Sequence, residues 1–124
     1  MSTGLDLQSL REVRSKPFLC NSRAVFTSTE LAYCASKRDP VQSICGLIST
    51  KEAFIKAVSA FDDVPAFRFT HVQIDHDPAG RPSLRFAGEL AAWLESNALS
   101  ASMSISHSGD IVGSIVVLAG RCRR

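Results

Sequence analysis

Apolar and polar positions alternate with two different periods along the chain. In the middle, apolar residues recur every three to four positions, the period of an amphipathic helix; over residues 101–107 serines take every second position, the period of a strand. The pattern predicts a strand at 4–7, a helical segment at 9–15, a helix after Thr27, a longer helix from Pro40, strands at 67–74 and 83–86, a helix at 89–99, and strands at 101–107 and 111–118. This order predicts one α+β domain over residues 1–124 with a mostly antiparallel sheet.

Two of the predicted helix starts carry capping residues. Thr27 and Glu30 have the spacing of a capping box, in which each side chain bonds the other residue's backbone N–H. Asp39 followed by Pro40 is a typical N-cap and first helical position. The tetrapeptide at 77–80, DPAG, predicts the turn of a hairpin.

Composition excludes several classes of protein. The 124 residues are 45% hydrophobic and 21% charged, with a net charge of +2, which does not indicate a nucleic-acid binder. No apolar run approaches the roughly 20 residues of a membrane helix, and residues 1–4 lack the features of a signal peptide. We therefore expect a cytoplasmic protein with no nucleic-acid or membrane partner. The cysteines form no CxxC pair, so we expect reduced thiols at Cys20, Cys34, Cys45 and Cys122.

Residues 11–23 form the one local charge asymmetry. Four basic residues, Arg11, Arg14, Lys16 and Arg23, stand there against a single acid, Glu12. The stretch is either a solvated face or a docking surface for a partner, and charge alone does not distinguish the two.

Four residues could carry chemistry. Asp6 lies at a predicted strand end, Glu52 and Lys56 lie four apart on one helix face, and His107 ends a predicted strand. Each also has an ordinary structural explanation, so their spacing alone does not identify a reaction.

Three stretches together resemble one known family. Residues 4–7 (GLDL), 25–31 (VFTSTEL) and 51–57 (KEAFIKA) resemble, in order, motifs of the stand-alone holo-acyl-carrier-protein synthases, a group of small 4′-phosphopantetheinyl transferases. Residues 80–82 (GRP) and 103–108 (MSISHS) add weaker similarity, so the resemblance covers nearly the whole chain.

The resemblance implies an α+β homotrimer with active sites between subunits. Such enzymes transfer phosphopantetheine from CoA to a serine of an acyl carrier protein, in fatty-acid or polyketide biosynthesis, and release 3′,5′-ADP. By position, Asp6 and Glu52 are expected to hold Mg²⁺, a cation that favours carboxylates and phosphate oxygens. Glu52, Lys56 and His107 are the expected catalytic residues, with Glu52 as the base and His107 also lining the nucleotide site.

Further residues are expected to bind CoA. Ser106 and His107 receive this role from the same resemblance, whereas Arg23, Lys37 and Arg38 are expected to replace a phosphate-binding arginine of the family that is absent here. The basic residues Arg11, Arg14, Lys16 and Arg23 are expected to dock the acidic helix of a carrier protein through complementary charge.

Three positions depart from the family pattern. Glu12 stands where a basic residue is usual, Leu47 replaces an arginine that helps hold CoA phosphate, and residues 59–61 (SAF) replace a glycine-rich turn. The side chain of Phe61 is expected to add bulk where the ligand passes. These changes leave an alternative open: a protein on the same scaffold that does not use CoA, either an acid–base enzyme acting on a carrier-bound or small biosynthetic substrate or a non-catalytic partner of a carrier protein.

Overall fold

A three-stranded antiparallel sheet forms the base of the structure, a computed structural model that describes residues 1–121. Its strands are β1 (Ser2–Ser9), β4 (Leu99–Ser108) and β5 (Ile111–Gly120), with β5 between the other two. A second antiparallel sheet pairs β2 (Val72–His76) with β3 (Pro82–Phe86). The predicted α+β class and antiparallel pairing are confirmed.

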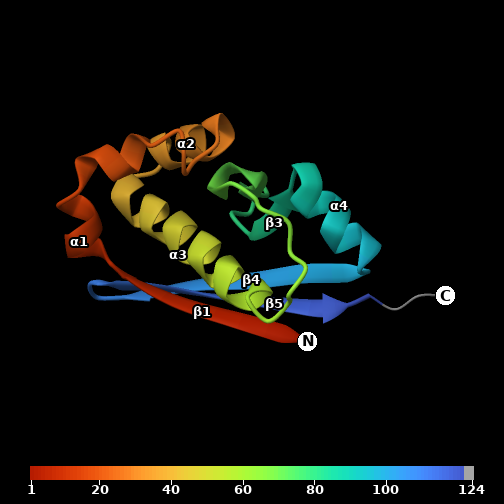
Figure 1. Cartoon of the computed structure of the whole chain (residues 1–124). Helices are drawn as coiled ribbons and strands as arrows, with labels where there is room; N and C mark the ends of the chain where they lie inside the picture. Colours follow the sequence, from red (N-terminus) through yellow and green to blue (C-terminus); the bar gives the residue numbers. More distant parts are fainter. Residues whose placement is uncertain (122–124) are drawn as a thin grey trace.

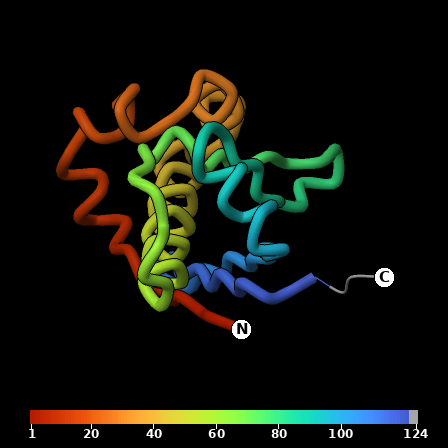
Figure 2. The backbone as a smooth tube through the Cα atoms, turned by 45° about the vertical axis from the view of Figure 1, so that its right-hand side comes forward, coloured from red at the N-terminus to blue at the C-terminus, as the bar shows by residue number. Residues whose placement is uncertain are grey.

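All the helices lie on one face of the larger sheet (Figure 1). They are α1 (Leu10–Arg14), α2 (Ser28–Ala35), α3 (Pro40–Val58) and α4 (Gly88–Ser96), with short 3₁₀ turns η1 (Pro17–Asn21) and η2 (Phe69–His71). The β2–β3 hairpin projects to one side of α3 (Figure 2). Among the described helices, none combines the length and hydrophobicity needed to cross a bilayer.

The predicted helix caps are confirmed. Thr27 Oγ1 accepts from the Glu30 N–H at 3.2 Å, and a Glu30 carboxylate oxygen accepts from the Thr27 N–H at 2.9 Å. The Asp39 side chain accepts from the Gln42 N–H at 3.2 Å, with Pro40 as the first residue of α3.

The predicted boundaries are wrong in three places. Phe67 and Phe69 do not belong to a strand: the Arg68 N–H donates to His71 Nδ1, the chain turns through η2, and β2 begins only at Val72. The helix predicted at 89–99 ends at Ser96, because Ala98 adopts a left-handed φ of 51°. The first strand extends beyond residues 4–7 to all of β1.

The last strand, β5, is buried on one face only. Val112 and Val116 point into the core, whereas Ile111 and Ile115 are 42% and 40% exposed on the face that carries no helix. The face of the sheet that carries no helix therefore exposes apolar side chains to solvent.

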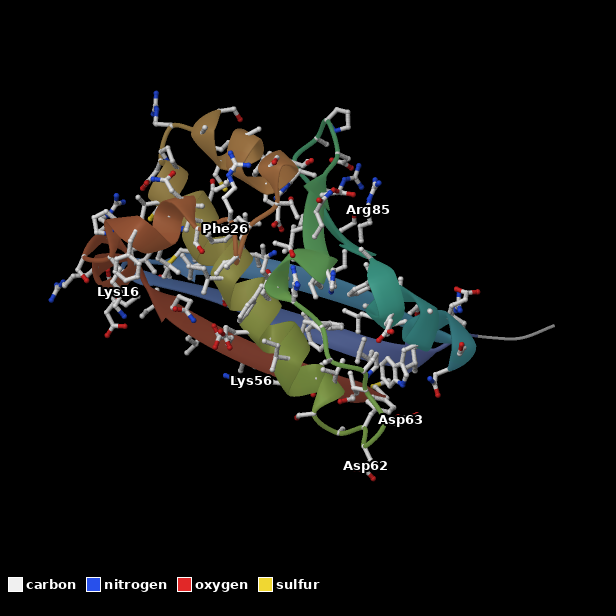
Figure 3. All side chains as sticks on the ribbon, turned by 45° about the horizontal axis from the view of Figure 1, so that its top comes forward. Lys16, Phe26, Lys56, Asp62, Asp63 and Arg85 are labelled. Atoms are coloured by element: carbon white, nitrogen blue, oxygen red, sulfur yellow. The ribbon has the colours of Figure 1, made fainter. Side chains whose placement is uncertain are left out.

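Two apolar clusters fill the space around α3. One packs Phe54, Leu90 and Val116 together near α4, and the other packs Phe26 and Leu47 near α2. Figure 3 shows Phe26 between α2 and α3. The long helix therefore joins the two halves of the core.

Gly4 permits close contact between β1 and α3. A Cβ atom at this position would lie 1.8 Å from the Ala53 carbonyl oxygen and 2.7 Å from the Ala57 nitrogen, both backbone atoms that cannot move aside. The glycine of the Gly-x-Asp motif thus lets β1 pack closely on α3. This close packing places Asp6 in contact with α3.

We expect Gly4→Ala to lower the free energy of unfolding by about 1–3 kcal/mol, the usual range when an extra methyl group is forced into a packed core. The measurement is chemical denaturation beside a matched control, Gly120→Ala, whose added Cβ meets no atom within 4 Å. Equal stability of the two variants would show that α3 does not pack this closely on β1.

Candidate active site

Asp6 lies where β1 packs against α3. Side chains alternate along the strand, so Gly4 and Asp6 face the helix while Leu5 and Leu7 face outward. The Ser49 hydroxyl on α3 donates to the Asp6 carbonyl at 2.9 Å. The Asp6 side chain is only 10% exposed and is held in a defined position.

Both oxygens of the Asp6 carboxylate accept hydrogen bonds. Lys56 Nζ lies 3.1 Å from Oδ1 and also donates to the Leu5 carbonyl at 3.0 Å, while Gln8 Nε2 donates to Oδ2 at 2.6 Å. Helical side chains lean toward the helix N-terminus, so Lys56 reaches back along α3 to Asp6. Figure 3 shows Lys56 on the side of α3 next to β1.

Glu52 shares the helix face that meets Asp6. Residues 49, 52 and 56 follow the spacing of one helical stripe, and the first and last of them both bond to β1. Glu52 is partly exposed, and its carboxylate takes part in none of the side-chain hydrogen bonds or ion pairs of residues 1–121. Lys56 pairs with Asp6 rather than with Glu52, leaving the Glu52 carboxylate available to a ligand.

His107 lies on the opposite edge of the sheet from these three residues. Asp6 pairs with Ser114 of β5, and Ser114 pairs with Ile105 of β4. Two strand spacings, about 10 Å, therefore separate β1 from β4, and His107 is two residues farther along β4. One chain brings Asp6, Glu52 and Lys56 together but does not bring His107 to them.

The residues expected to bind CoA also fall in separate places. His107 lines a cavity between α3 and β4, and Lys37 lies near it with Nζ 4.6 Å from the centre of the Tyr33 ring. Ser106 points to the outer face of the sheet, and Arg23 lines a different cavity beside residues 67–70. Arg38 is exposed in the α2–α3 connection.

The basic stretch at 11–23 is exposed but partly neutralised. Arg14 forms a 2.7 Å ion pair with Asp39, whereas the side chains of Arg11 and Lys16 make no ion pair within residues 1–121. Phe18, in the same stretch, is 76% exposed. The surface therefore combines unpaired cations with an exposed aromatic ring.

Two departures from the family pattern have structural explanations. Leu47 is buried in the core beside Phe26, and it also lines the cavity that contains His107. The Phe61 ring packs edge-on against Trp93 with centroids 5.3 Å apart, so it belongs to the main core cluster. The Phe61 ring is therefore directed toward Trp93 and the core cluster near α4.

A buried ion pair, which was not predicted from the sequence, links two of the motifs. Lys51 Nζ lies 2.8 Å from Glu30 Oε1, and the two side chains are 1% and 0% exposed. Lys51 also donates to the Phe69 carbonyl, and Glu30 accepts from the Ile74 N–H. Burial lowers the pKa of Lys51, and its hydrogen bond and charge interaction with Glu30 oppose that shift. Two charged residues inside otherwise apolar helix faces were the signal that could have revealed this pair.

The described cysteines are free thiols, as expected. Burial raises the pKa of Cys34 to about 12 and that of Cys45 to about 11, and it also raises the pKa of the partly exposed Cys20. These thiols stay protonated near neutral pH and are poor nucleophiles. Cys122 lies outside the described residues.

Comparisons with known proteins agree on one family. A sequence model of the 4′-phosphopantetheinyl transferase superfamily matches residues 2–113. The holo-[acyl-carrier-protein] synthase of Neisseria meningitidis is 33% identical over 113 residues, covering 88% of this chain and 90% of that protein. The one from Syntrophus aciditrophicus (strain SB) is 28% identical over 122 residues, covering 95% and 94%.

Solved structures show the same relationship. The Chronobacterium ammoniagenes ACPS–CoA complex has a TM-score of 0.82 at 26% identity and covers 98% of both chains. The Neisseria meningitidis holo-[acyl-carrier-protein] synthase has a TM-score of 0.80 at 29% identity and covers 95% of this chain and 97% of that one. With the motif residues placed as described, this chain belongs to the 4′-phosphopantetheinyl transferase superfamily, in the holo-[acyl-carrier-protein] synthase family.

Proposed function

We propose that this protein transfers 4′-phosphopantetheine from CoA to a serine of an acyl carrier protein, in the cytoplasm and with Mg²⁺ as its metal. The observation that carries the proposal is the cluster of Asp6, Glu52 and Lys56 between β1 and α3. The relatives are named for this activity, and one of the similar solved structures is a CoA complex.

The donor set fits Mg²⁺. This cation takes one or two protein carboxylates and completes its octahedral shell with water and phosphate oxygens. Asp6 and Glu52 supply such a pair of carboxylates. Residues 1–121 contain no cluster of three or more His, Cys, Asp or Glu side chains of the kind that a metal held by protein ligands alone would need. When bound, the ion would neutralise charge on the pyrophosphate of CoA.

The protein's own groups account for the remaining requirements of the transfer. The serine oxygen attacks the phosphorus that carries pantetheine, the bond from that phosphorus to the bridging oxygen breaks, and 3′,5′-ADP leaves. Glu52 accepts the serine proton, directly or through a water molecule. Lys56 is 54% exposed, so its ammonium group can turn from Asp6 to a phosphate oxygen.

Binding of CoA and the carrier protein uses the remaining candidate residues. Arg23, Lys37, Arg38, Ser106 and His107 contact CoA in this proposal. The exposed cations Arg11, Arg14, Lys16 and Arg23 attract an acidic carrier protein, although Arg14 must share its charge with Asp39.

The proposal includes a homotrimer with sites between subunits. The outer face of the sheet is an exposed apolar surface around Leu5, Leu7, Ile111 and Ile115, with a shallow groove of about 330 Å³. Such a surface indicates a protein partner. In such a trimer, the β4 edge of one copy lies against the β1 edge of the next. His107 of one copy then lies near Asp6 of its neighbour, although the two residues are far apart within one chain.

The first experiment is a calorimetric titration of CoA into the folded protein with and without Mg²⁺, followed by a transfer assay with an apo acyl carrier protein. Micromolar, Mg²⁺-dependent binding and formation of the holo carrier support the proposal. A folded protein that binds no CoA would instead favour a scaffold with another role, acting on carrier-bound substrates or as a non-catalytic partner.

We expect Ile115→Asp to convert the trimer to monomers, because each copy would bury a carboxylate in the apolar interface. Light scattering coupled to size-exclusion chromatography measures the mass, and circular dichroism checks the fold. Ser83→Asp, on the exposed side of β3, is the matched control and should remain trimeric. A trimeric Ile115→Asp variant would place the interface elsewhere.

A further inference from the structure

A small cavity between α3 and β4 contains two of the three histidines. Its volume is about 130 Å³, and its lining includes Leu47, His76, Ile105 and His107. Sites that hold a whole drug-sized ligand usually have about 300–1,000 Å³. This cavity has room for one chemical group rather than for a complete cofactor.

The His76 ring is fixed in place by aromatic stacking. It lies parallel to the Tyr33 ring, with centroids 3.6 Å apart and an interplanar angle of 5°. Nδ1 of His76 is buried and has no hydrogen-bond partner among residues 1–121. A buried polar atom without a partner is uncommon, and it indicates a contact that a ligand or water completes.

The cavity wall carries no permanent charge. Tyr33, Gln42 and Ser43 supply its other polar side chains, and none of the lining residues is an acid, a lysine or an arginine. The basic side chains of this wall are the imidazoles of His76 and His107. An anion entering this cavity would find its counter-charge on an imidazole.

The surroundings of His76 lower its pKa when no anion is present. Burial lowers its pKa, and Lys37 lowers it further. Three nearby acids raise the pKa of His76. Each of them already has a cationic partner: Glu30 pairs with Lys51, Asp75 with Arg85, and Asp77 with Arg81. His107 faces the same cavity from β4.

We propose that His76 joins His107, which the proposed function already places against CoA, in binding a phosphate group of the nucleotide part of CoA in this cavity, and that His76 takes up a proton on binding. The inference rests on the proposed function and adds a binding residue and a pH dependence to it. Because the anion favours the protonated imidazole, the pKa of His76 is higher in the complex than in the free protein. Affinity therefore rises as the pH falls from the bound pKa toward the free pKa.

The test measures binding of 3′,5′-ADP by calorimetry at pH 8 and pH 6, in two buffers of different ionisation enthalpy at each pH. We expect wild-type protein to gain about tenfold more affinity on acidification than His76→Gln, since one unit of pKa shift corresponds to a tenfold change in affinity. Proton uptake should also be larger in the wild type. Protonation of the phosphate itself affects all variants equally and cancels in this comparison.

His71→Gln is the matched control, because it removes the third histidine, at the other end of β2, and should behave like the wild type. If His76→Gln keeps the full pH dependence, the inference is overturned. If that variant does not fold, NMR titration of the wild-type histidines with and without 3′,5′-ADP decides: a raised His76 pKa supports the inference, and an unchanged one refutes it. CoA and 3′,5′-ADP failing to bind at any pH would refute the proposed function itself, whereas pH-independent binding refutes only the role of His76.

Discussion

Glu30→Ala is expected to lower the free energy of unfolding by about 3–5 kcal/mol, because it leaves the Lys51 ammonium buried without a counter-charge. The change also removes the acceptor for the Thr27 and Ile74 N–H groups, so it disrupts the start of α2 and the packing of β2 together. Urea denaturation followed by circular dichroism measures the loss.

The chain offers a matched control at its surface. Glu95 pairs with Arg121 at 3.0 Å, but their side chains are 76% and 41% exposed. Solvent-exposed pairs contribute about 1 kcal/mol or less, so Glu95→Ala should change stability little. A comparable loss in both variants would mean that burial of the Glu30–Lys51 pair has no special energetic weight.

A double variant separates the charge from the hydrogen bonds. Glu30→Leu with Lys51→Met removes both charges and should recover part of the stability lost in the single variant. Recovery should be incomplete, because the Thr27 and Ile74 N–H groups and the Phe69 carbonyl then lack these side-chain partners. Full recovery would show that these bonds contribute little.

The sequence predicted those parts of the fold that depend on local chemistry. The capping box at Thr27, the Asp39-Pro40 helix start and the turn at 77–80 were all readable, because each depends on residues a few positions apart. Phe67 and Phe69 misled because an apolar residue at every second position also suits an irregular segment packed on a core. The end of α4 could not be predicted because the left-handed position there is Ala98, whereas this backbone conformation is usually signalled by a glycine.

The candidate site was only partly readable for a similar reason. Gly4 is required because the backbone of β1 packs directly against the backbone of α3. A contact between segments so far apart in the sequence cannot be predicted from a local pattern. Likewise, Lys51 belongs to a buried pair, whereas Lys56, one turn and a half farther along the helix, reaches Asp6. His107 could be named from its strand but not placed, because strand order decides which edge it occupies.

Glu52→Gln is expected to reduce phosphopantetheine transfer by at least about a hundredfold, the lower end of what a general base contributes. The amide keeps the size of the carboxylate but has lost the charge that attracts Mg²⁺ and the basicity that accepts the serine proton. Because the Glu52 carboxylate has no bond to other described residues, its replacement should leave the unfolding free energy unchanged. The assay is formation of holo carrier protein, with Mg²⁺ varied.

Two further variants make this result specific. Glu89→Gln, an exposed glutamate in the first turn of α4, is the matched control and should transfer at the wild-type rate. Asp6→Asn should lose transfer and also some stability, because the Lys56 ammonium then loses its charged partner. Asp6 would therefore have two roles, in structure and in metal binding, while Glu52 would have a chemical role alone. Wild-type transfer by Glu52→Gln would remove the carboxylate from both the metal and the proton transfer, and the cluster between β1 and α3 would then be an ion pair that stabilises the fold.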